Sequence, residues 1–438
     1  MTRTIDHTHD PAARSWVESA GRPNGDFPIQ NLPFGVFRRR GRGEAARIGV
    51  AIGDEVVDLS RAIGQGLLTG VDQEAQTAGT SRSLNAIMAL GRDAARQIRH
   101  RLFAMLQQGS PDQAAVTGCL VPAETVDLLL PVEVGDYTDF YASIHHATNI
   151  GTMFRPESPL LPNYKFVPIG YHGRASSLVV GGTPVRRPMG QIKDDQAPTP
   201  VFGPTRALDY ECEIGAYIAS GNALGTEIRL ADAENHLFGI SLLNDWSARD
   251  IQRWEYQPLG PFLAKNFATS LSAWVVTADA LAPFRVPAFD RPSGDPDPLP
   301  YLFSDANQRS GGIDVTVEVW LSTARMRAEN VAAVRLSRSS LATMYWTTAQ
   351  LITHHASNGC NLRPGDLLGS GTISGPSRDA RGCLQELVGR AGESIDLPTG
   401  EQRRFLMDGD EVTLRGFCER AGTTRIGLGE CRGLVLPA

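Results

Sequence analysis

Residues 207–219 read ALDYECEIGAYIA, in which acidic and apolar side chains alternate. In a β-strand, side chains two residues apart point to the same face. The alternation therefore predicts a strand with Asp209, Glu211 and Glu213 on one face and apolar side chains on the other. Like charges that lie so close together repel one another. The strand accordingly needs some feature that makes three neighbouring carboxylates tolerable.

Two interpretations of these carboxylates stay open on spacing alone. In the first, they bind a hard divalent cation, since Ca²⁺ takes about 6–8 oxygen ligands and Mg²⁺ takes about six. Further carboxylates are available from two loops, at Asp136 and Asp139 in GDYTDFY and at Asp245 after the apolar run 238–243. In the second interpretation, the stretch is a solvated edge strand whose acids face water.

The composition is that of a soluble globular protein. The chain has 438 residues, 42% hydrophobic and 21% charged, which is enough for two or three domains. The net charge of −6 does not favour nucleic acid, and no apolar run approaches the ~20 residues of a membrane span. The first residues have no apolar segment typical of a secretory signal. Six cysteines without a C-x-x-C pair favour a reduced, cytoplasmic protein.

Local patterns divide the chain into two domains. Residues 47–59 predict a β-hairpin with a turn at Gly53, and residues 83–108 predict a helix that Gly91 divides. From about residue 130, glycine is frequent and short β-like runs alternate with turns, which predicts a β-rich domain with few helices. The expected fold is mixed and β-rich (α+β). The expected segments are a flexible N-terminal tail at 1–25, a small domain at 26–125 and a larger domain at 126–438.

His146 is the better candidate of the tandem histidines 145 and 146 to act beside a metal bound by these acids. If residues 139–150 form a helix, Asp139 and His146 are seven residues apart and share a face, while His145 points elsewhere. A satisfied core or surface histidine is the commoner role for a single histidine, and that alternative stays open. The run GSGTISG at 369–375 is also ambiguous. Its glycines either let backbone N–H groups approach a ligand or form a tight turn between strands.

Cationic and amide side chains follow the same acids in the sequence. NDWSARDIQRWEY offers Arg249, Gln252 and Tyr256 after Asp245, and GPFLAKNFATS offers Lys265 in an apolar setting. Each alone is usually part of a surface ion pair. Clustered beside acidic ligands, they can stabilise an oxyanion. The sequence lacks the nucleophile elbow G-x-S-x-G and the zinc motif H-E-x-x-H.

Taken together, these stretches resemble the fumarylacetoacetase family. The resemblance runs from DFPIQNLPFGVF at Asp26 nearly to the C-terminus, and the first 25 residues have no counterpart in it. NDWSARDIQ and LGPFLAKNF are shared with a wider hydrolase superfamily, whereas the DYTDFY…HATN…MFR block and the N-terminal domain are specific to the family. The resemblance implies a small SH3-like N-terminal β domain, a larger mixed β-roll domain and a homodimer.

The resemblance also implies an activity, the hydrolysis of a carbon–carbon bond in 4-fumarylacetoacetate to give fumarate and acetoacetate. This reaction is the last step of tyrosine and phenylalanine (homogentisate) catabolism. The implied substrate is a small diketo acid, and the implied cofactor is a divalent cation, Ca²⁺ and/or Mg²⁺.

The residues that match the family's functional positions fall into three sets. The metal ligands are matched by Asp139, Glu211, Glu213 and Asp245, with Lys265 and Thr269 near a second cation site. The catalytic positions are matched by His146 as general base, Glu386 as the acid that orients it, and Arg249, Gln252 and Lys265 as the oxyanion-stabilising group. The substrate contacts are matched by Tyr141, Arg155, Tyr171, Gln252, Tyr256 and Thr372. The family uses neither His145 nor Asp209, which is expected to be a neighbouring polar residue or a solvated end of the strand.

Two other classes of function stay open. Another enzyme of the superfamily, such as an acylpyruvate or diketone hydrolase or a metal-dependent decarboxylase or hydratase, would share the metal site. It would not need the DYTDFY…HATN block or the N-terminal domain, and this sequence has both. A binding or structural role instead predicts scattered polar residues and no stoichiometric divalent ion.

Overall fold

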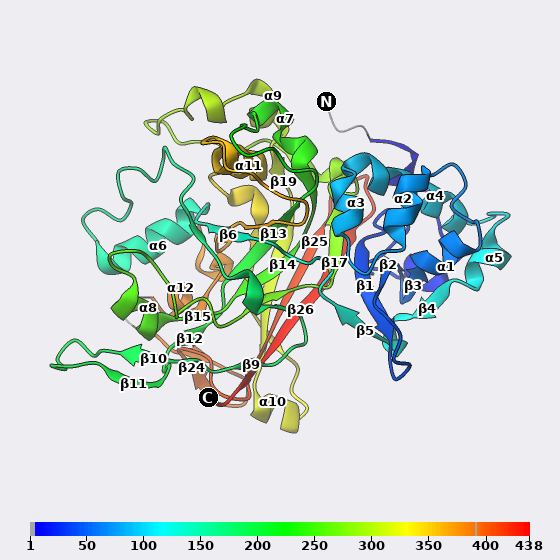
Figure 1. The fold of residues 1–438 in the computed structure, drawn as a ribbon. Coiled ribbons are helices and arrows are strands. Elements are labelled where there is room, and N and C mark those ends of the chain that lie inside the picture. The colour runs from blue at the N-terminus through cyan, green and yellow to red at the C-terminus, as the bar shows by residue number, and fades with distance from the viewer. Residues whose placement is uncertain (1–4, 390–391) are drawn as a thin grey trace.

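The computed structural model of the chain describes residues 5–389 and 392–438, which form two regions in Figure 1. The N-terminal region, blue to cyan, combines short helices with a small group of strands, and the larger region is rich in strands. Within the described residues, no helix is both long and apolar enough to cross a membrane. The fold is therefore mixed α/β in two parts. The SH3-like and β-roll classifications and the domain boundaries stay predictions.

The N-terminal region contains both elements that the sequence predicts there. The hairpin at 47–59 is confirmed, with Gly53 at its turn (φ 55°), and Gly91 (φ 80°) divides the helix at 83–108. The strands are β1 (Phe34–Arg39), β2 (Arg47–Ile52), β3 (Glu55–Asp58), β4 (Leu120–Pro122) and β5 (Val126–Leu129). The helices are α1 (Leu59–Gly64), α2 (Gln73–Gly79), α3 (Asn85–Ala89), α4 (Arg92–Leu106) and α5 (Gln113–Thr117).

Residues 5–25 pack on this region. Arg99 of α4 is only 1% exposed and donates a hydrogen bond to the Thr8 hydroxyl (3.2 Å). On the same helix, the His100 ring is hydrogen-bonded to the Asp6 carboxylate (2.8 Å). The described part of the expected flexible tail is therefore held by specific contacts, and residues 1–4 lie outside the described residues.

A single long sheet runs through both regions. Along the described chain its main path is β4-β3-β2-β1-β17-β14-β13-β22-β6-β7, and β1 pairs antiparallel with β17 where Phe34 faces Val275. The strands not yet given are β6 (Tyr137–Phe140), β7 (Gly170–His172), β8 (Leu178–Val180), β13 (Cys212–Ile218), β14 (Leu237–Asp245), β16 (Thr269–Leu271), β17 (Trp274–Thr277) and β22 (Leu367–Gly369). The apolar core of the N-terminal region is accordingly completed by side chains from far along the chain, among them Tyr217, Phe238, Leu243, Val275 and Leu367.

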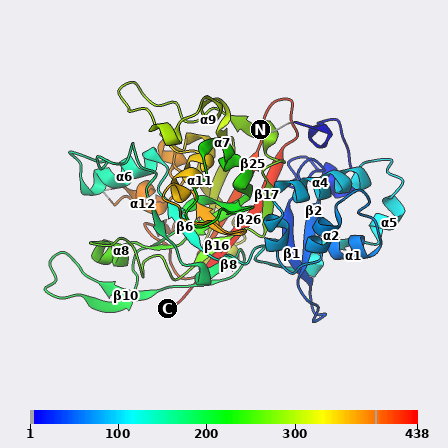
Figure 2. The ribbon, with the colours of Figure 1, turned by 45° about the horizontal axis from the view of Figure 1, so that its top comes forward.

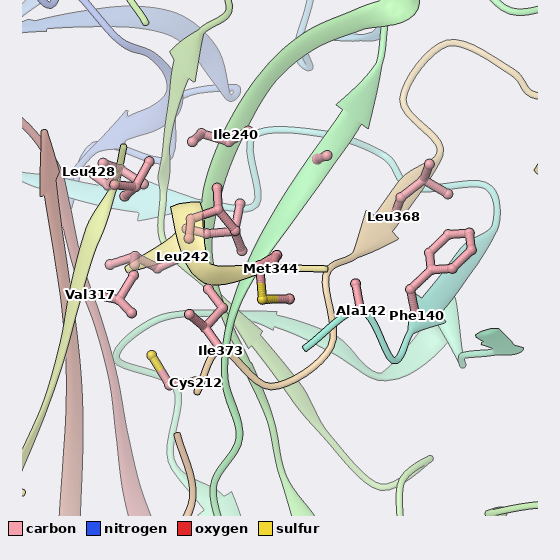
Figure 3. Close-up of a cluster of buried hydrophobic side chains, with 14 of the residues drawn as sticks. Phe140, Ala142, Cys212, Ile240, Leu242, Val317, Met344, Leu368, Ile373 and Leu428 are labelled. Atoms are coloured by element: carbon pink, nitrogen blue, oxygen red, sulfur yellow. The ribbon is translucent and has the colours of Figure 1, made fainter. Parts of the chain in front are cut away.

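A second sheet packs on the first and forms the main apolar core with it. Figure 3 shows Ile240 and Leu242 of β14 beside Val317 and Leu428 of the second sheet. Gly416 permits this close approach, because a Cβ there would lie 2.8 Å from a Leu242 methyl group. The second sheet has the order β21 (Val334–Ser340), β20 (Thr316–Ser322), β25 (Glu411–Cys418), β26 (Ile426–Leu436) and β9 (Val185–Arg186).

The stretch 207–219 forms two strands and not one. Its first part, β12 (Leu208–Asp209), pairs with β15 (Ser247–Ala248) in a separate small sheet. Its second part, β13, lies between β14 and β22, and every residue of it is buried. The prediction of one continuous strand is therefore wrong, and so is the alternative of a solvated edge strand. The chain changes partner strands between Asp209 and Cys212, which takes Asp209 out of the alternation.

The helix predicted at 139–150 begins later than expected. It is α6 (Ile144–Phe154), which starts after Ser143, whose hydroxyl accepts a hydrogen bond from the His146 backbone N–H (3.2 Å). Asp139 lies in β6, so the prediction that Asp139 and His146 share a helix face is wrong. After Asp245, the stretch that carries Arg249 and Gln252 forms α8 (Arg249–Glu255).

The remaining elements surround this core, and Figure 2 shows the hairpin of β10 and β11 projecting on the side away from the N-terminal region. The helices are α7 (Leu230–Ala233), α9 (Asp305–Ser310), α10 (Ala324–Ala328), α11 (Thr348–Ala356) and α12 (Leu384–Val388). The small strand pairs are β10 (Met189–Ile192) with β11 (Val201–Pro204), β18 (Arg285–Val286) with β19 (Gly312–Ile313), and β23 (Ile395–Asp396) with β24 (Gln402–Arg403).

Candidate active site

Four buried carboxylates meet at neighbouring strands of the long sheet. Glu213 lies in β13, Glu211 directly precedes that strand, Asp245 ends β14, and Asp139 lies in β6. One carboxylate oxygen from each residue lies within 4.8 Å of the others. The four side chains are at most 5% exposed. The structure therefore brings together the four residues that the resemblance assigns to a metal ion, and we call them the carboxylate cluster.

Glycine makes room for the carboxylate cluster. Gly369 of β22 lies opposite Asp139 of β6, and a Cβ at position 369 would be 2.5 Å from Asp139 Oδ1 and 3.1 Å from a Glu213 oxygen. Gly371 has φ 75° and donates its backbone N–H to Glu213 (3.0 Å). The glycines of GSGTISG therefore permit close approach to the cluster as well as a turn.

Lys265 and two hydroxyl groups hold one side of the cluster. The Lys265 ammonium contacts Glu211 and donates to Asp245 Oδ2 (2.6 Å). Asp245 also accepts hydrogen bonds from the Thr269 hydroxyl (3.1 Å) and the Tyr171 hydroxyl (2.9 Å). Both oxygens of Asp245 therefore have donors within the protein, and the single positive charge of Lys265 offsets only part of the negative charge.

On the other side of the cluster, two carboxylate oxygens have no hydrogen-bond donor among the described residues. Asp139 Oδ1 and Glu213 Oε1 are buried, and no hydrogen-bond donor among the described residues reaches either atom. The Tyr137 hydroxyl, which lies beside Gly369, is in the same condition within this part of the chain. Unsatisfied buried polar atoms are rare in native proteins and call for an ion or water. Because hard cations prefer oxygen ligands, the cluster fits a divalent ion such as Ca²⁺ or Mg²⁺.

The electrostatics of the cluster favour the same conclusion. Burial raises the pKa of Asp139, Glu213 and Asp245, and neighbouring carboxylates raise each of them further. Burial alone would also raise the pKa of Glu211, but the positive charges of Lys265 and Arg249 lower it. A cation among these groups would stabilise their ionised forms against mutual repulsion.

A histidine–carboxylate pair lies close to the cluster. His146 Nδ1 is 2.7 Å from Glu386 Oε2, and the side chains are 3% and 0% exposed. Hydrogen bonds link the pair to the cluster, because Asp209 accepts from the Leu384 N–H of the helix that carries Glu386, and Arg249 donates to both Asp209 and Glu211. With Nδ1 bonded to a carboxylate, the ring presents Nε2 as its remaining nitrogen.

Glu386 is itself held by several donors. Its carboxylate accepts hydrogen bonds from Asn149 (2.8 Å) and Ser374 (2.8 Å), and Cys383 Sγ lies 3.3 Å from it. Burial alone would raise the pKa of Glu386, but the His146 ring and these donors lower it to about 2. The carboxylate is therefore ionised at neutral pH despite its complete burial.

Arg249, at the first position of α8, connects Asp209 to Glu211 of the carboxylate cluster. Its Nε donates to Asp209 (2.9 Å), and its Nη1 donates to Glu211 (2.7 Å) and to the Gln252 amide oxygen (3.2 Å). Its Nη2 is buried and has no acceptor among the residues that the structure describes. One N–H group of a fixed guanidinium is thus left to bind a further acceptor.

The residues matched to substrate contacts are less uniform in position. Tyr171 contacts the cluster through Asp245, and the ring of Tyr141 packs edge-on against His146 with centroids 5.3 Å apart. Thr372 is 1% exposed, with a hydroxyl that has no partner in the described chain. Arg155 and Tyr256 are exposed, and Arg155 donates to the Pro159 carbonyl (3.2 Å). His145 instead packs against Phe289 (6.3 Å between centroids), as its different helix face predicts.

Sequence reasoning missed several polar residues of the site. Asn149 follows His146 by three positions on α6, and that spacing could have predicted a shared partner. Ser374 gives no such signal, because its bond to Glu386 depends on how the chain folds back between them. Asp209, expected as a neighbouring polar residue or a solvated end of the strand, is 0% exposed and bonded to Arg249. The solvated end is wrong, because the chain leaves the strand there and turns the carboxylate inward, whereas a polar residue beside the site agrees with the bond to Arg249.

Two family models match the chain. Residues 30–131 match the model described as fumarylacetoacetase N-terminal, and residues 137–436 match the model described as fumarylacetoacetate (FAA) hydrolase C-terminal. Together the two matches span nearly the whole chain.

Curated relatives and solved structures agree with the family models. The chain is 48% identical to a fumarylacetoacetase of Homo sapiens over 420 residues, which are 94% of this chain and 97% of the human one. It is 45% identical to a fumarylacetoacetase of Oryza sativa over 432 residues, 97% of each chain. A solved fumarylacetoacetate hydrolase from Exiguobacterium antarcticum has 17% identity and a TM-score of 0.50, covering 93% of this chain and all of the other. That likeness concerns the fold alone.

Proposed function

The chain belongs to the fumarylacetoacetase family, and from that premise we propose that it hydrolyses a carbon–carbon bond of 4-fumarylacetoacetate to give fumarate and acetoacetate. This reaction would place it at the last step of tyrosine and phenylalanine catabolism. The observation that carries the proposal is one buried site. It contains the carboxylate cluster, the His146–Glu386 pair and Arg249, whose Nη2 has no acceptor among the described residues. Arg249 binds Glu211 of the cluster and also Asp209, which holds the start of the helix that carries Glu386.

Hydrolysis of a 1,3-diketone poses two chemical problems. Water must attack a ketone carbon, and the leaving carbon must depart as an enolate. Asp139, Glu211, Glu213 and Asp245 would hold a Ca²⁺ or Mg²⁺ ion, which when bound supplies Lewis-acid stabilisation of the developing enolate oxygen. Lys265 and Thr269, which both contact Asp245, would border a second cation position.

His146 is the proposed general base. Its Nδ1 faces Glu386 at 2.7 Å, which favours the tautomer with the proton on Nδ1 and leaves the Nε2 lone pair free. Nε2 would then take a proton from the attacking water. Glu386 would stabilise the imidazolium that forms, as the aspartate does in a Ser-His-Asp triad.

The tetrahedral intermediate needs donors for its oxyanion. Arg249, Gln252 and Lys265 are the proposed donors, and the free Nη2 of Arg249 supports this role. Arg155 would pair with a substrate carboxylate, since its planar guanidinium suits two-point recognition. The proposed substrate contacts are completed by Tyr141, Tyr171, Gln252, Tyr256 and Thr372.

We also propose a homodimer. Large apolar side chains are exposed on the β10–β11 hairpin and after α8, at Met189 (44%), Val201 (61%), Phe202 (72%), Leu259 (97%) and Phe262 (66%). The two segments are joined by a hydrogen bond from Trp254 of α8 to Gln191 of β10 (3.1 Å). Exposed apolar side chains on two adjoining segments support burial against a second copy. The six free cysteines support a reducing, cytoplasmic setting.

A direct assay tests the proposed activity. Purified protein with Mg²⁺ or Ca²⁺ should consume fumarylacetoacetate, followed by loss of diketone absorbance, and release fumarate and acetoacetate in equal amounts. Chelation should stop turnover and re-addition of the ion should restore it. An acylpyruvate serves as the comparison substrate. Turnover of the acylpyruvate with no turnover of fumarylacetoacetate would reject the proposal in favour of another superfamily activity.

A further inference from the structure

The Asp209 carboxylate is saturated with hydrogen bonds although none of the functions above uses it. Oδ1 accepts from the backbone N–H groups of Tyr210 (2.8 Å) and Leu384 (2.8 Å). Oδ2 accepts from the backbone N–H of Gln385 (3.0 Å) and from Arg249 Nε (2.9 Å). The residue is 0% exposed. Four donors on one buried carboxylate are more than its own short strand requires.

On one side, Asp209 holds the start of α12. The first N–H groups of a helix have no partner within the helix, and a side chain at the preceding position usually satisfies one of them. Cys383 occupies that position here and makes no such bond. Asp209, distant in sequence, satisfies two of these N–H groups instead. The next residue of α12 is Glu386, so the position of that carboxylate depends on how the first turn is held.

On the other side, Asp209 fixes the plane of Arg249. A guanidinium is planar, so bonds at Nε and Nη1 together determine the direction of every remaining N–H. Asp209 binds Nε, while Glu211 and Gln252 bind Nη1. These contacts also fix the direction of the buried Nη2, whose N–H groups have no acceptor among the described residues.

We propose that Asp209 is a positioning residue that sets Arg249 and α12 in one fixed relation, so that the oxyanion donor and the acid that holds His146 share one anchor. The expected loss of kcat rests on the proposed function. The structural part of the inference, the joint fixing of Arg249 and α12, is independent of the substrate. A displacement of catalytic groups by about 1 Å can cost about 10²-fold in rate.

Asp58 is a matched control in the other region of the molecule. It is also 0% exposed, it caps α1 through the Arg61 N–H (3.1 Å), and it accepts from Arg47 Nη1 (2.8 Å). Asp58 thus joins a helix start to an arginine as Asp209 does, but away from the site. Any loss of stability from removing a buried carboxylate should appear in both variants, whereas a positioning effect should appear only at Asp209.

The kinetic experiment compares Asp209→Asn with Asp58→Asn. In Asp209→Asn the new NH₂ group faces Arg249 Nε and the Gln385 N–H, which are both donors. We expect kcat to fall about 10²-fold with KM little changed, because an oxyanion donor acts in the transition state. Asp58→Asn should lower the melting temperature and leave kcat unchanged. Equal kcat in wild type and Asp209→Asn would overturn the proposal.

A double-mutant cycle separates positioning from general destabilisation. Because Asp209 is proposed to act partly through Arg249, the kcat loss of Asp209→Asn should shrink in an Arg249→Gln background. Fully additive losses would overturn that link. If Asp209→Asn does not fold, Asp209→Glu retains the charge and moves the carboxylate by one methylene. It should then lose about tenfold or more in kcat, and wild-type kcat in Asp209→Glu would overturn the proposal.

Hydrogen exchange makes the result independent of the substrate. Asp209→Asn should speed amide exchange in residues 384–388, and Asp58→Asn should not. Unchanged exchange there would overturn the anchor even in an active enzyme. If wild type failed to hydrolyse fumarylacetoacetate, the proposed function would fall, while faster exchange in α12 would still support the anchor.

Discussion

Asp209 lies within four residues of Glu211 and Glu213 of the carboxylate cluster, yet it is held in the opposite way from the cluster members Asp139 and Glu213. Asp209 accepts four hydrogen bonds from the protein. Asp139 and Glu213 each keep a buried oxygen that no donor in the described chain reaches. Burial of a charge is costly unless hydrogen bonds or an opposite charge compensate it. Asp209 is compensated by the folded chain alone, whereas full compensation of Asp139 and Glu213 would require a cation.

This difference separates a structural carboxylate from a ligand-binding one without reference to any relative. Asp209, Asp139 and Glu213 are all buried, and the number of donors already present distinguishes Asp209 from the other two. The criterion does not extend to Asp245 and Glu211, which belong to the cluster although Lys265 and other groups already donate to them. The same criterion assigns Glu386 to the compensated kind, since it has His146, Asn149 and Ser374 as partners.

The largest expected effect on kcat concerns the hydrogen-bonded pair of His146 and Glu386. His146→Ala should lower kcat by about 10³–10⁴-fold, because it removes the general base. Metal content, measured by elemental analysis, should stay at the wild-type level, because His146 is not in the cluster. Wild-type turnover in this variant would show that the base assignment is wrong.

Glu386→Gln tests how much compensation stabilises the fold. The pKa of Glu386 is lowered to about 2 in the folded protein, against 4.5 for an ordinary glutamate. Its contribution, about 3 kcal/mol, is therefore present above pH 4.5 and is lost as the pH falls toward 2. The difference in unfolding free energy between wild type and Glu386→Gln should shrink over this range. A difference that is constant from pH 6 to 2.5 would contradict the assignment.

Metal removal tests the cluster, in which Asp139 and Glu213 each keep an oxygen without a donor in the described chain. A cation that binds only the folded protein adds about 2.7 kcal/mol at a concentration 100-fold above its Kd. The melting temperature should rise with added Ca²⁺ or Mg²⁺ and fall after chelation. Asp139→Asn should weaken this response, and Asp58→Asn should retain it in full. No response of the wild type to either ion would remove the cation from the proposal.

The smallest effect is the most direct contrast between the two kinds of acid. In chelated protein at pH 9, above the pKa of about 8 that burial and the neighbouring Asp245 give Asp139, Asp139→Asn should raise the melting temperature, because it removes a buried charge that repels its neighbours. The gain should be about 1 kcal/mol. Asp209→Asn should lower the melting temperature in the same assay. If both variants shift it in the same direction, the number of donors is not a valid criterion.

Local sequence patterns predicted the elements that depend on neighbouring residues. The hairpin with its turn at Gly53 and the helix division at Gly91 follow from turn and cap chemistry. The prediction of one strand over residues 207–219 was wrong, because alternation tells which face a side chain occupies only as long as the residues belong to one continuous strand. At Asp209 the chain pairs with β15, and no local pattern specifies that choice of partner.

The site was predictable to different depths. The four cluster residues could be named from a resemblance, but their convergence depends on β6, β22, β13 and β14 lying side by side. Asp139 was placed on a helix because periodicity could not separate the end of a short strand from the start of α6. The partners of Glu386 could not be predicted as a set, because they come from α6 and from the GSGTISG run.

The shared core between the two regions has a consequence for biosynthesis. The apolar side chains that complete the N-terminal core include Tyr217, Val275 and Leu367, and β1, which also pairs with β2 and β5, gains a further partner strand in β17. A ribosome that adds about 5–20 residues per second reaches these positions well after the N-terminal strands have emerged. The nascent N-terminal region therefore exposes part of its apolar core until these later residues are synthesised. A chaperone that binds exposed apolar surface would act mainly in this interval.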